Sequence, residues 1–379
     1  MEQVKTLRPD LIVIAAYRYD QIMSRMIANG LVDRVLVYYD VNPPVPLQPD
    51  PDQIIGAEEI CALAYGWSQG EKHFPDQLNV TLTTLCNCSC IFCAYHSNVD
   101  PKRTMASITF EQGVADALAA GMTTLDFSPL IGETLIDVKA IDKMAMARGA
   151  GIKTIKLTTN GTRLNMDSDR LSRLLDLTAA ISISTPGLNH EAYAAVFRFK
   201  RYEDVIQGLE KLAQAKRANP KGAHINLCLR SYRSFDQAFQ DSDFQRLSTY
   251  IKEGTLFFDP GDGNLTFDNW SGTIGPDDLL PGMAVKPVTV STTALPCRFL
   301  VYGNATLLPE GSVRICPCRY LETIYDDLVI GNVNSAPLAD ILFNRTHCSL
   351  VMDWLDGRLP IPCRTCSLYT PAVRGQANP

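Results

Sequence analysis

The chain has 379 residues, of which 46% are hydrophobic and 20% charged, the composition of an ordinary globular protein. Its length exceeds that of one average domain, so we expect two or three packed units. The net charge of −6 gives no electrostatic footprint for nucleic acid or for an anionic membrane surface, and both partners are disfavoured.

The N-terminal stretch MEQVKTLRPDLIVIAAYR lacks a basic region followed by a small-residue cleavage site, and no apolar run approaches membrane-spanning length. We therefore expect a cytoplasmic protein. Twelve cysteines would suggest disulfides in a short secreted chain, but here they cluster at metal-ligand spacings. Reduced thiolates on metal are the consistent interpretation.

Residues 10–40 read as strand, helix, strand: an apolar LIVIAAY, an amphipathic YDQIMSRMIANGL, and RVLVYYD ending at Asp40. This βαβ unit has no G-x-G-x-x-G between strand and helix, so a phosphate cradle is missing. A structural or docking role is favoured over an independent nucleotide site. Five prolines between positions 43 and 51 form a stiff connection, and we place this unit and its linker at residues 1–55.

The stretch LTTLCNCSCIFCAYH, residues 82–96, carries Cys86, Cys90 and Cys93 in the spacing C-x3-C-x2-C. Three thiolates on one short loop can hold three corners of a cubane [4Fe–4S] cluster and leave the fourth iron open to a small molecule. A zinc site or buried structural thiols are the alternatives, but a closed zinc site wants four ligands. Cys88 lies inside the loop but outside the pattern, and we interpret it as a bystander.

This loop, with Phe92 before its last cysteine, resembles the cluster loop of the radical SAM superfamily. The resemblance implies that the open iron binds the amino and carboxylate groups of S-adenosylmethionine. In that family, one-electron reduction cleaves this cofactor to a 5′-deoxyadenosyl radical, which abstracts hydrogen from the substrate. The resemblance also implies an external electron donor of the flavodoxin or ferredoxin type.

From residue 77 onward, strands and helices alternate six times, which implies parallel strands joined by crossovers. The expected strands begin near residues 78, 123, 153, 179, 224 and 255, and the expected helices span 109–120, 137–148, 167–177, 202–217 and 243–252. This pattern resembles the partial (β/α)6 barrel of the radical SAM family. The fold class is therefore α/β, and we place the barrel at residues 56–260.

The expected strands alternate apolar and polar residues, as in Ile181, Ser182, Ile183 and Ser184. Because side chains alternate across a strand, the apolar set must face the helices and the polar set the barrel interior. A solvent-facing antiparallel sheet would give the same alternation of apolar and polar residues, but the helices between the strands argue against such a sheet. A polar interior suits a charged cofactor and a hydroxylated substrate.

Several interior residues match positions that bind S-adenosylmethionine in the family. Gly132 and Glu133 fall where the family carries Gly-Gly-Glu, although Ile131 replaces the first glycine. Ser182 and Ser184 match polar positions that contact the ribose or the carboxylate. Arg198 is either a partner of the cofactor carboxylate, which a guanidinium binds bidentately, or a surface arginine.

Cys228 and Arg230 are the candidate catalytic residues on the fifth strand. The alternation points Cys228 into the barrel, where a thiol could return a hydrogen atom to a substrate radical, as a radical epimerase requires. The alternative is a small buried hydrophobe, the commoner role of a free cysteine. Arg230 could bind a substrate hydroxyl or carboxylate.

The C-terminal part, residues 261–379, has a second set of cysteines: Cys297, Cys316, Cys363 and Cys366. Cys297 is followed after thirteen residues by Gly311 and then by Cys316, which resembles the C-x9–15-G-x4-C element of SPASM and twitch domains. This resemblance implies a hairpin around Asn304 and Gly311, and we expect a helix at residues 337–343 before the last two cysteines. Only one C-x2-C follows, so the shorter twitch form fits better, with these four cysteines on one auxiliary [4Fe–4S] cluster. A zinc ribbon is the alternative, and Cys318 or Cys348 could substitute as ligands.

The two resemblances imply a radical SAM enzyme that removes hydrogen from a carbinol carbon of a sugar or aminocyclitol-like small molecule, in natural-product or glycan biosynthesis. Epimerisation is slightly preferred over dehydrogenation because of Cys228. The alternative is a peptide-modifying enzyme that forms thioether or carbon–carbon crosslinks. That class predicts an N-terminal winged helix, which the βαβ pattern does not resemble.

Overall fold

In the computed structural model, the described residues are 12–14, 35–37 and 51–374, except 234–236, 239, 260–264, 292, 318 and 319. Strands β1 (Ile12–Ile14) and β2 (Val35–Val37) pair in parallel, as a βαβ unit requires. The expected helix between them, Asp40 and the proline-rich linker up to residue 50 lie outside the described residues, as does the expected domain boundary at 260.

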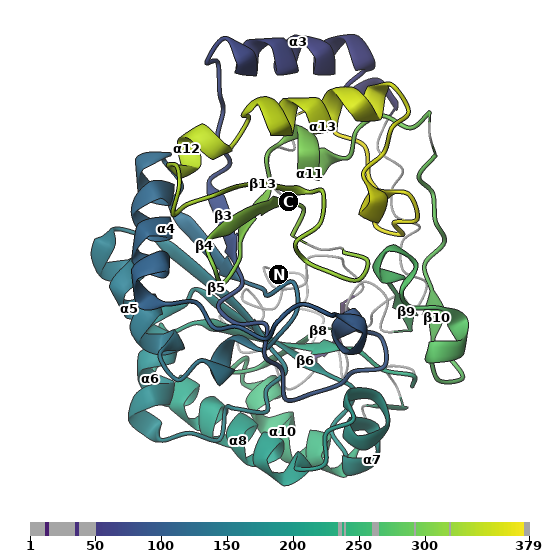
Figure 1. Cartoon of the computed structure of the whole chain (residues 1–379). Coiled ribbons are helices and arrows are strands. Elements are labelled where there is room, and N and C mark those ends of the chain that lie inside the picture. The colour runs from purple at the N-terminus through teal and green to yellow at the C-terminus, as the bar shows by residue number, and fades with distance from the viewer. Residues whose placement is uncertain are drawn as a thin grey trace.

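Six parallel strands in chain order form the centre of the molecule (Figure 1). They are β3 (Gln77–Val80), β4 (Thr124–Phe127), β5 (Thr154–Thr159), β6 (Ala180–Thr185), β7 (His224–Leu229) and β8 (Phe257–Asp259). The helices between and after them are α4 (Ser107–Ala119), α5 (Ala140–Ala150), α6 (Ser168–Leu177), α7 (His190–Ala192), α8 (Tyr202–Ala218) and α10 (Ser242–Lys252). The predicted α/β alternation is confirmed, with the strand starts and the helix ends at most three residues from the predicted positions.

Local sequence explains where several helices begin. The side chain of Asp167 accepts a hydrogen bond from the Arg170 backbone N–H at 2.9 Å, which caps the first turn of α6. Asn344 caps α13 (Arg345–Leu355) in the same way through the His347 N–H. None of the helices in the described part of the chain is long and apolar enough to cross a membrane.

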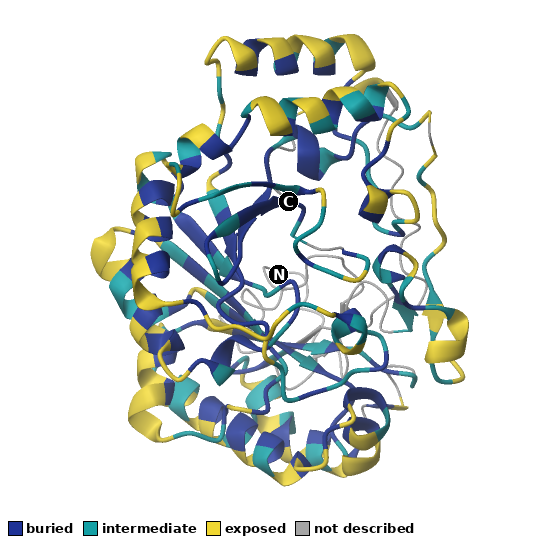
Figure 2. Cartoon of the chain, viewed as in Figure 1, coloured by how far each residue is buried: buried dark blue, intermediate teal, exposed yellow. Residues whose placement is uncertain are grey.

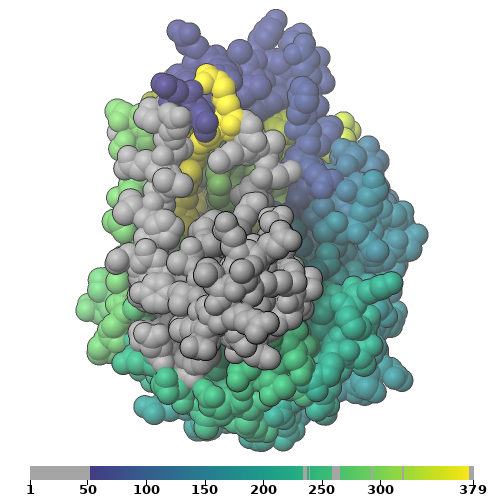
Figure 3. All heavy atoms as spheres, turned by 180° about the vertical axis from the view of Figure 1, so that it is seen from behind, coloured from purple at the N-terminus to yellow at the C-terminus, as the bar shows by residue number. Residues whose placement is uncertain are grey.

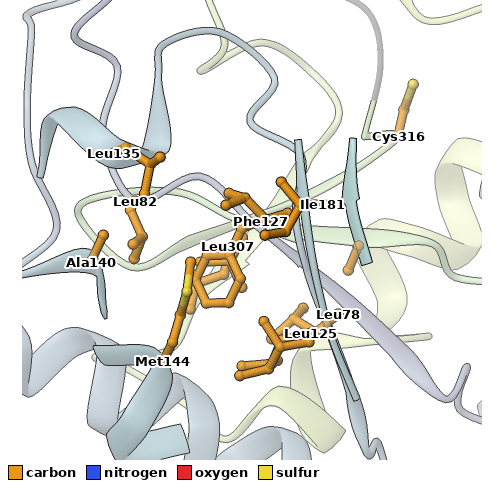
Figure 4. Packing of buried hydrophobic residues seen from close by; sticks show 14 of the residues in the cluster. Leu78, Leu82, Leu125, Phe127, Leu135, Ala140, Met144, Ile181, Leu307 and Cys316 are labelled. Atoms are coloured by element: carbon orange, nitrogen blue, oxygen red, sulfur yellow. The ribbon is translucent and has the colours of Figure 1, made fainter. Parts of the chain in front are cut away.

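The strands separate their two faces as the alternation predicts. In β5 and β6 every second residue is buried and the residues between are half-buried. Figure 2 shows the buried side of the outer helices turned toward the sheet and the exposed side turned outward. Figure 4 shows the packing between them, in which Leu78, Leu125 and Phe127 from the strands meet Met144 of α5. The polar residues are thereby left for the interior.

The C-terminal part extends the same sheet. The hairpin of β11 (Ala305–Leu307) and β12 (Ser312–Ile315) forms as predicted, and β13 (Val329–Asn332) pairs with β12. Strand β11 also pairs in parallel with β3, giving one nine-stranded sheet in the order β13-β12-β11-β3-β4-β5-β6-β7-β8. The sequence did not indicate this junction. It fixes the second cysteine set relative to the barrel.

The remaining elements close one end of the molecule. They are α3 (Ala57–Ser68), α11 (Arg298–Val301), α12 (Leu338–Ile341), α13, and the short parallel pair of β9 (Thr266–Phe267) and β10 (Ala284–Val285). The expected helix at 337–343 is the shorter α12, and α13 was not predicted. Helix α3 packs beside α13 (Figure 1). Nearby, the Ile55 N–H donates to the Ala372 carbonyl at 3.0 Å, so residues after 51 lie beside the C-terminal residues (Figure 3).

Candidate active site and auxiliary cysteine cavity

A cavity of about 400 Å³ opens at the carboxyl ends of the barrel strands, within the usual range for small-molecule sites. The loop after β3, the segments after β4, β5 and β7, and the end of β6 all contribute to its wall. Ligands commonly bind at this edge of parallel sheets because strand ends and loops converge there. The predicted site residues on its wall are Cys86, Cys90, Cys93, Gly132, Glu133, Ser184 and Arg230.

The cysteine loop is held in place by backbone hydrogen bonds to the π-helix Tyr193–Phe197. The Ile91 N–H donates to the Val196 carbonyl at 2.9 Å, and the Ser89 N–H donates to the Phe197 carbonyl at 3.1 Å. The structure thus brings the three predicted ligands to one side of the cavity. Cys88, interpreted as a bystander, is buried on the same wall.

Gly132 lies against the cysteine loop in a conformation that requires glycine. Its φ is +103°, and a Cβ built on it would lie 2.1 Å from the Thr83 carbonyl oxygen. The next N–H, of Glu133, donates to the Leu85 carbonyl at 2.8 Å. The Gly-Glu pair therefore fastens the segment after β4 to the residues that precede Cys86.

The Glu133 carboxylate is buried and accepts three hydrogen bonds. Its donors are the Thr159 hydroxyl at 2.7 Å, the Asn160 backbone N–H at 2.8 Å and the Leu135 backbone N–H at 3.1 Å. Burial raises the pKa of Glu133, and these three donors oppose that shift. The carboxylate thus anchors the end of β5 beside the cysteine loop, in addition to its predicted role toward the cofactor.

Asn160 is a site residue to which the sequence assigned no function. Its Nδ2 lies 3.3 Å from the Cys88 sulfur and 3.8 Å from the Cys86 sulfur, and donates to the Asn87 Oδ1 at 3.2 Å. The available signal was the run TTNG, residues 158–161, which contains Asn160 and lies at the expected end of a barrel strand. An amide aimed at two sulfurs can orient a ligand loop.

The remaining predicted cofactor residues lie in different places. Ser184 lines the cavity, whereas Ser182 lies two residues farther from the carboxyl ends of the strands. Arg198 ends the π-helix with a φ of +52° and is exposed, outside the cavity wall. This placement agrees with the surface arginine of the two interpretations, and its contact with a cofactor carboxylate remains a prediction.

Arg230 and Cys228 also differ in placement. Arg230 lines the cavity just after β7. Cys228 lies beside Ser184 in the β6–β7 register, half-buried and off the cavity wall, and the Asn226 side chain donates to its sulfur at 3.5 Å. The guanidinium is thus the better placed of the two for contact with a substrate.

Residues of the C-terminal part complete the wall of the cavity beside the cysteine loop. Phe267 stacks on Phe92 with ring centroids 4.8 Å apart, and the Trp270 indole N–H donates to the Phe92 carbonyl at 2.8 Å. Beside them, the Asp268 carboxylate lies 3.5 Å from the Lys286 ammonium. The sequence gave no signal for these residues, because they reach the cysteine loop only through the tertiary fold.

A second cavity brings together the four cysteines predicted to bind the auxiliary cluster, Cys297, Cys316, Cys363 and Cys366. The rest of its wall is apolar or aromatic, including Phe299, Leu300, Leu328, Trp354 and Tyr369. Burial, with the nearby Cys316 thiolate, raises the pKa of Cys297 to about 12. Burial also raises the pKa of Cys363, and thiols of this kind keep their protons unless a metal compensates the thiolate charge, so the donor set fits a metal cluster.

The structure describes one of the two possible substitute ligands, Cys348. Cys318 lies outside the described residues. Cys348 is on α13, with its sulfur 3.7 Å from the Phe343 carbonyl oxygen and 3.9 Å from that of Ala64. Cys348 therefore faces α3 rather than the four cysteines.

The model of the radical SAM superfamily matches residues 80–228, and that of the SPASM iron–sulfur cluster-binding domain matches residues 297–367. The chain contains a radical SAM domain followed by a SPASM iron–sulfur cluster-binding domain. The two matched regions contain the two cysteine sets. Together they imply S-adenosylmethionine and two [4Fe–4S] clusters as the cofactors of this radical SAM enzyme.

Curated relatives match about a third of the chain. The GTP 3′,8-cyclase of Chlorobaculum tepidum is 28% identical over 139 residues, and that of Paracoccus denitrificans is 31% identical over 140 residues. These matches cover 36% and 35% of this chain, and 41% and 39% of the relatives. The chain thus spans about two fifths of their length.

Matches to solved structures extend over more of the chain, and the match to SuiB shows a shared fold. SuiB of Streptococcus suis, bound to the precursor peptide SuiA, matches with a TM-score of 0.51 and 12% identity, over 87% of this chain and 78% of that one. BtrN in complex with AdoMet and 2-DOIA matches with a TM-score of 0.47 and 16% identity, over 78% and 93%. At these identities the likeness concerns architecture.

The two cavities fit the implied cofactors. Cys86, Cys90 and Cys93 would hold the radical-generating cluster, and the adjoining wall from Gly132 to Ser184 would bind S-adenosylmethionine. Cys297, Cys316, Cys363 and Cys366 would hold the auxiliary cluster without an open iron. These ligand sets remain predictions that iron analysis can test.

Proposed function

We propose that this enzyme removes a hydrogen atom from a carbinol carbon of a sugar or aminocyclitol-like substrate, in natural-product or glycan biosynthesis. The observation that carries the proposal is the set of hydroxyl groups at the ends of β4 and β5, on the wall of the cavity. Hydroxyl groups there form a chain, since the Ser128 Oγ lies 2.7 Å from the Thr158 Oγ1 and donates to Asp126 at 2.6 Å. Such groups can both donate to and accept from the hydroxyls of a polyol.

Bound S-adenosylmethionine and its cluster would supply the carbon-centred radical that takes the hydrogen atom. The residues of the chain position the substrate and exclude water. Arg230 would bind a hydroxyl or carboxylate of the substrate, and the stacked Phe92 and Phe267 would shield the reacting carbon from solvent. Electrons would come from an external donor of the flavodoxin or ferredoxin type.

Dehydrogenation is the outcome that the geometry supports best. Oxidising a carbinol to a ketone also requires the hydroxyl proton and one further electron to leave. Among the described residues, Glu133 and Asp268 are the carboxylates on the cavity wall. Three donors occupy Glu133, whereas Asp268 is paired with Lys286 and would accept the proton. The four-cysteine cavity is where an electron-accepting cluster could be held.

Epimerisation remains the second candidate because Cys228 lies beside Ser184, which lines the cavity. A small shift of the Cys228 side chain would bring the thiol within reach of a substrate radical. Peptide crosslinking is a weaker candidate. The parallel pairing of β1 and β2 differs from the antiparallel wing of a leader-binding winged helix.

The test is deuterium transfer. Reconstituted enzyme, a reductant and S-adenosylmethionine would be incubated with sugars and aminocyclitols deuterated at their carbinol carbons. We expect deuterium in the released 5′-deoxyadenosine together with a ketone product, detected by mass spectrometry. Deuterium transfer from a labelled precursor peptide, and from none of the polyols, would overturn the proposal.

A further inference from the structure

Residues 322–324 are fastened at several points to the residues that follow the radical-cluster loop. The Asp100 carboxylate accepts a hydrogen bond from the Ile324 N–H at 2.6 Å and one from the Thr323 hydroxyl. The Val99 N–H donates to the Glu322 carbonyl at 3.1 Å. These bonds join residues more than 220 positions apart and fix the position of Tyr320 over the loop.

Tyr320 is completely buried beside the residues that flank Cys93. It belongs to a small apolar cluster with Ala94, which directly follows Cys93. Its ring meets the Trp270 ring edge to face at 5.5 Å, and Trp270 in turn donates to the carbonyl of Phe92, which directly precedes Cys93. The Tyr320 ring thus lies among residues that contact the two chain neighbours of Cys93.

The Tyr320 hydroxyl has no hydrogen-bond partner among the described residues. Leaving a buried hydroxyl without a partner costs free energy, so native proteins almost always provide one. Along these contacts the predicted cluster ligand is Cys93, which lies between Phe92 and Ala94 in the chain. We therefore expect the hydrogen-bond acceptor of the Tyr320 hydroxyl at the metal site of Cys93.

We propose that the Tyr320 hydroxyl donates a hydrogen bond to the Cys93 sulfur of the radical-generating cluster. Hydrogen bonds to cluster sulfurs stabilise the reduced, more negative state and so raise the reduction potential. Tyr320 is thus a positioning residue that eases the first electron transfer, and it belongs to the C-terminal part. This inference rests on the ligand set proposed for Cys86, Cys90 and Cys93.

The experiment compares wild type with Tyr320→Phe by EPR-monitored redox titration, following the signal that changes on addition of S-adenosylmethionine. At a fixed potential we expect about tenfold less reduced cluster in the variant, as for the loss of a hydrogen bond to a charged sulfur. Tyr325→Phe is the matched control, because its hydroxyl lies on the same segment but donates to Glu310. An unchanged titration in Tyr320→Phe would overturn the proposal.

A second measurement, which detects the hydrogen bond directly in wild type, covers the case in which Tyr320→Phe loses its cluster. In D2O, pulsed EPR of the reduced cluster should detect an exchangeable deuteron that is absent from Tyr320→Phe and retained in Tyr325→Phe. Identical deuteron couplings in all three proteins would overturn the proposal. The ligand set is tested separately: if Cys86/Cys90/Cys93→Ala keeps the responsive signal, the ligand assignment fails, whatever the role of Tyr320.

Discussion

The two cysteine cavities are built in opposite ways. The radical-site cavity is open and partly polar, and its three predicted ligands come from one loop of eight residues. The auxiliary cavity is apolar, and its four cysteines come from three segments spread over 70 residues. An open iron needs polar neighbours to orient a cofactor, whereas a closed cluster needs only burial and ligands. The difference agrees with the proposal that one site binds the cofactor and substrate and that the other holds a closed cluster.

The largest effect should separate the two sites. Cys86/Cys90/Cys93→Ala should lower the iron content of reconstituted protein from about eight to about four atoms and abolish S-adenosylmethionine cleavage. Cys297/Cys316/Cys363/Cys366→Ala should remove the other four. Iron analysis and a 5′-deoxyadenosine assay measure both. Retention of all the iron in either variant would break the assignment of one cluster to each cavity.

Gly132→Ala should destabilise the radical-site loop. The positive φ and the Cβ that would lie 2.1 Å from the Thr83 carbonyl together should cost about 3 kcal/mol or more. Urea unfolding with an unchanged slope measures the loss. Gly121→Ala is the control, because its φ of +82° is also positive but no atom lies within 4 Å of the added Cβ. That variant should lose about 1–2 kcal/mol. Equal losses would show that the close approach to Thr83 does not matter.

Acid should lower the free energy of unfolding through His347, which lies near the auxiliary cavity. His347 is buried behind that cavity, where its Nε2 lies 2.7 Å from the carbonyl oxygen of Leu300, a wall residue. Burial lowers the pKa of His347 to about 4. Because the unfolded state takes up a proton near pH 6.5, stability contributed by the neutral ring is complete above that pH and falls toward pH 4, by about 3 kcal/mol.

The variant His347→Gln should remove this part of the pH dependence. Its free energy of unfolding should fall less between pH 6.5 and pH 4 than that of wild type, when both are measured by urea titration at each pH. Parallel stability curves for the two proteins would contradict a neutral, buried His347.

The smallest effect is expected for Cys228→Ala. Because this thiol lies off the cavity wall, cleavage of S-adenosylmethionine and formation of ketone should stay within about twofold of wild type, as for a substitution with no substrate contact. The same assay in D2O distinguishes the second candidate. Loss of deuterium uptake into an epimerised product would identify Cys228 as a hydrogen donor.

Patterns confined to short segments of the sequence predicted several features of the fold and of the candidate site. The spacing of Cys86, Cys90 and Cys93 predicted the cluster loop, because three thiolates on one short loop can hold three corners of a cubane cluster. The period of two along β5 and β6 predicted which side chains enter the barrel, because the pleat fixes their direction. The C-x13-G-x4-C spacing predicted the β11–β12 hairpin that carries Cys316.

Contacts between distant segments were decided only by the tertiary structure. The pairing of β11 with β3 joins the auxiliary half to the barrel, and no local pattern encodes which free sheet edge a hairpin will find. The same holds for Trp270 and Tyr320, which reach the Cys93 loop from positions about 180 and 230 residues away. Sequence therefore determined the chemistry of each cysteine set, and the fold decided what surrounds it, because side chains meet across the core according to packing and not according to spacing.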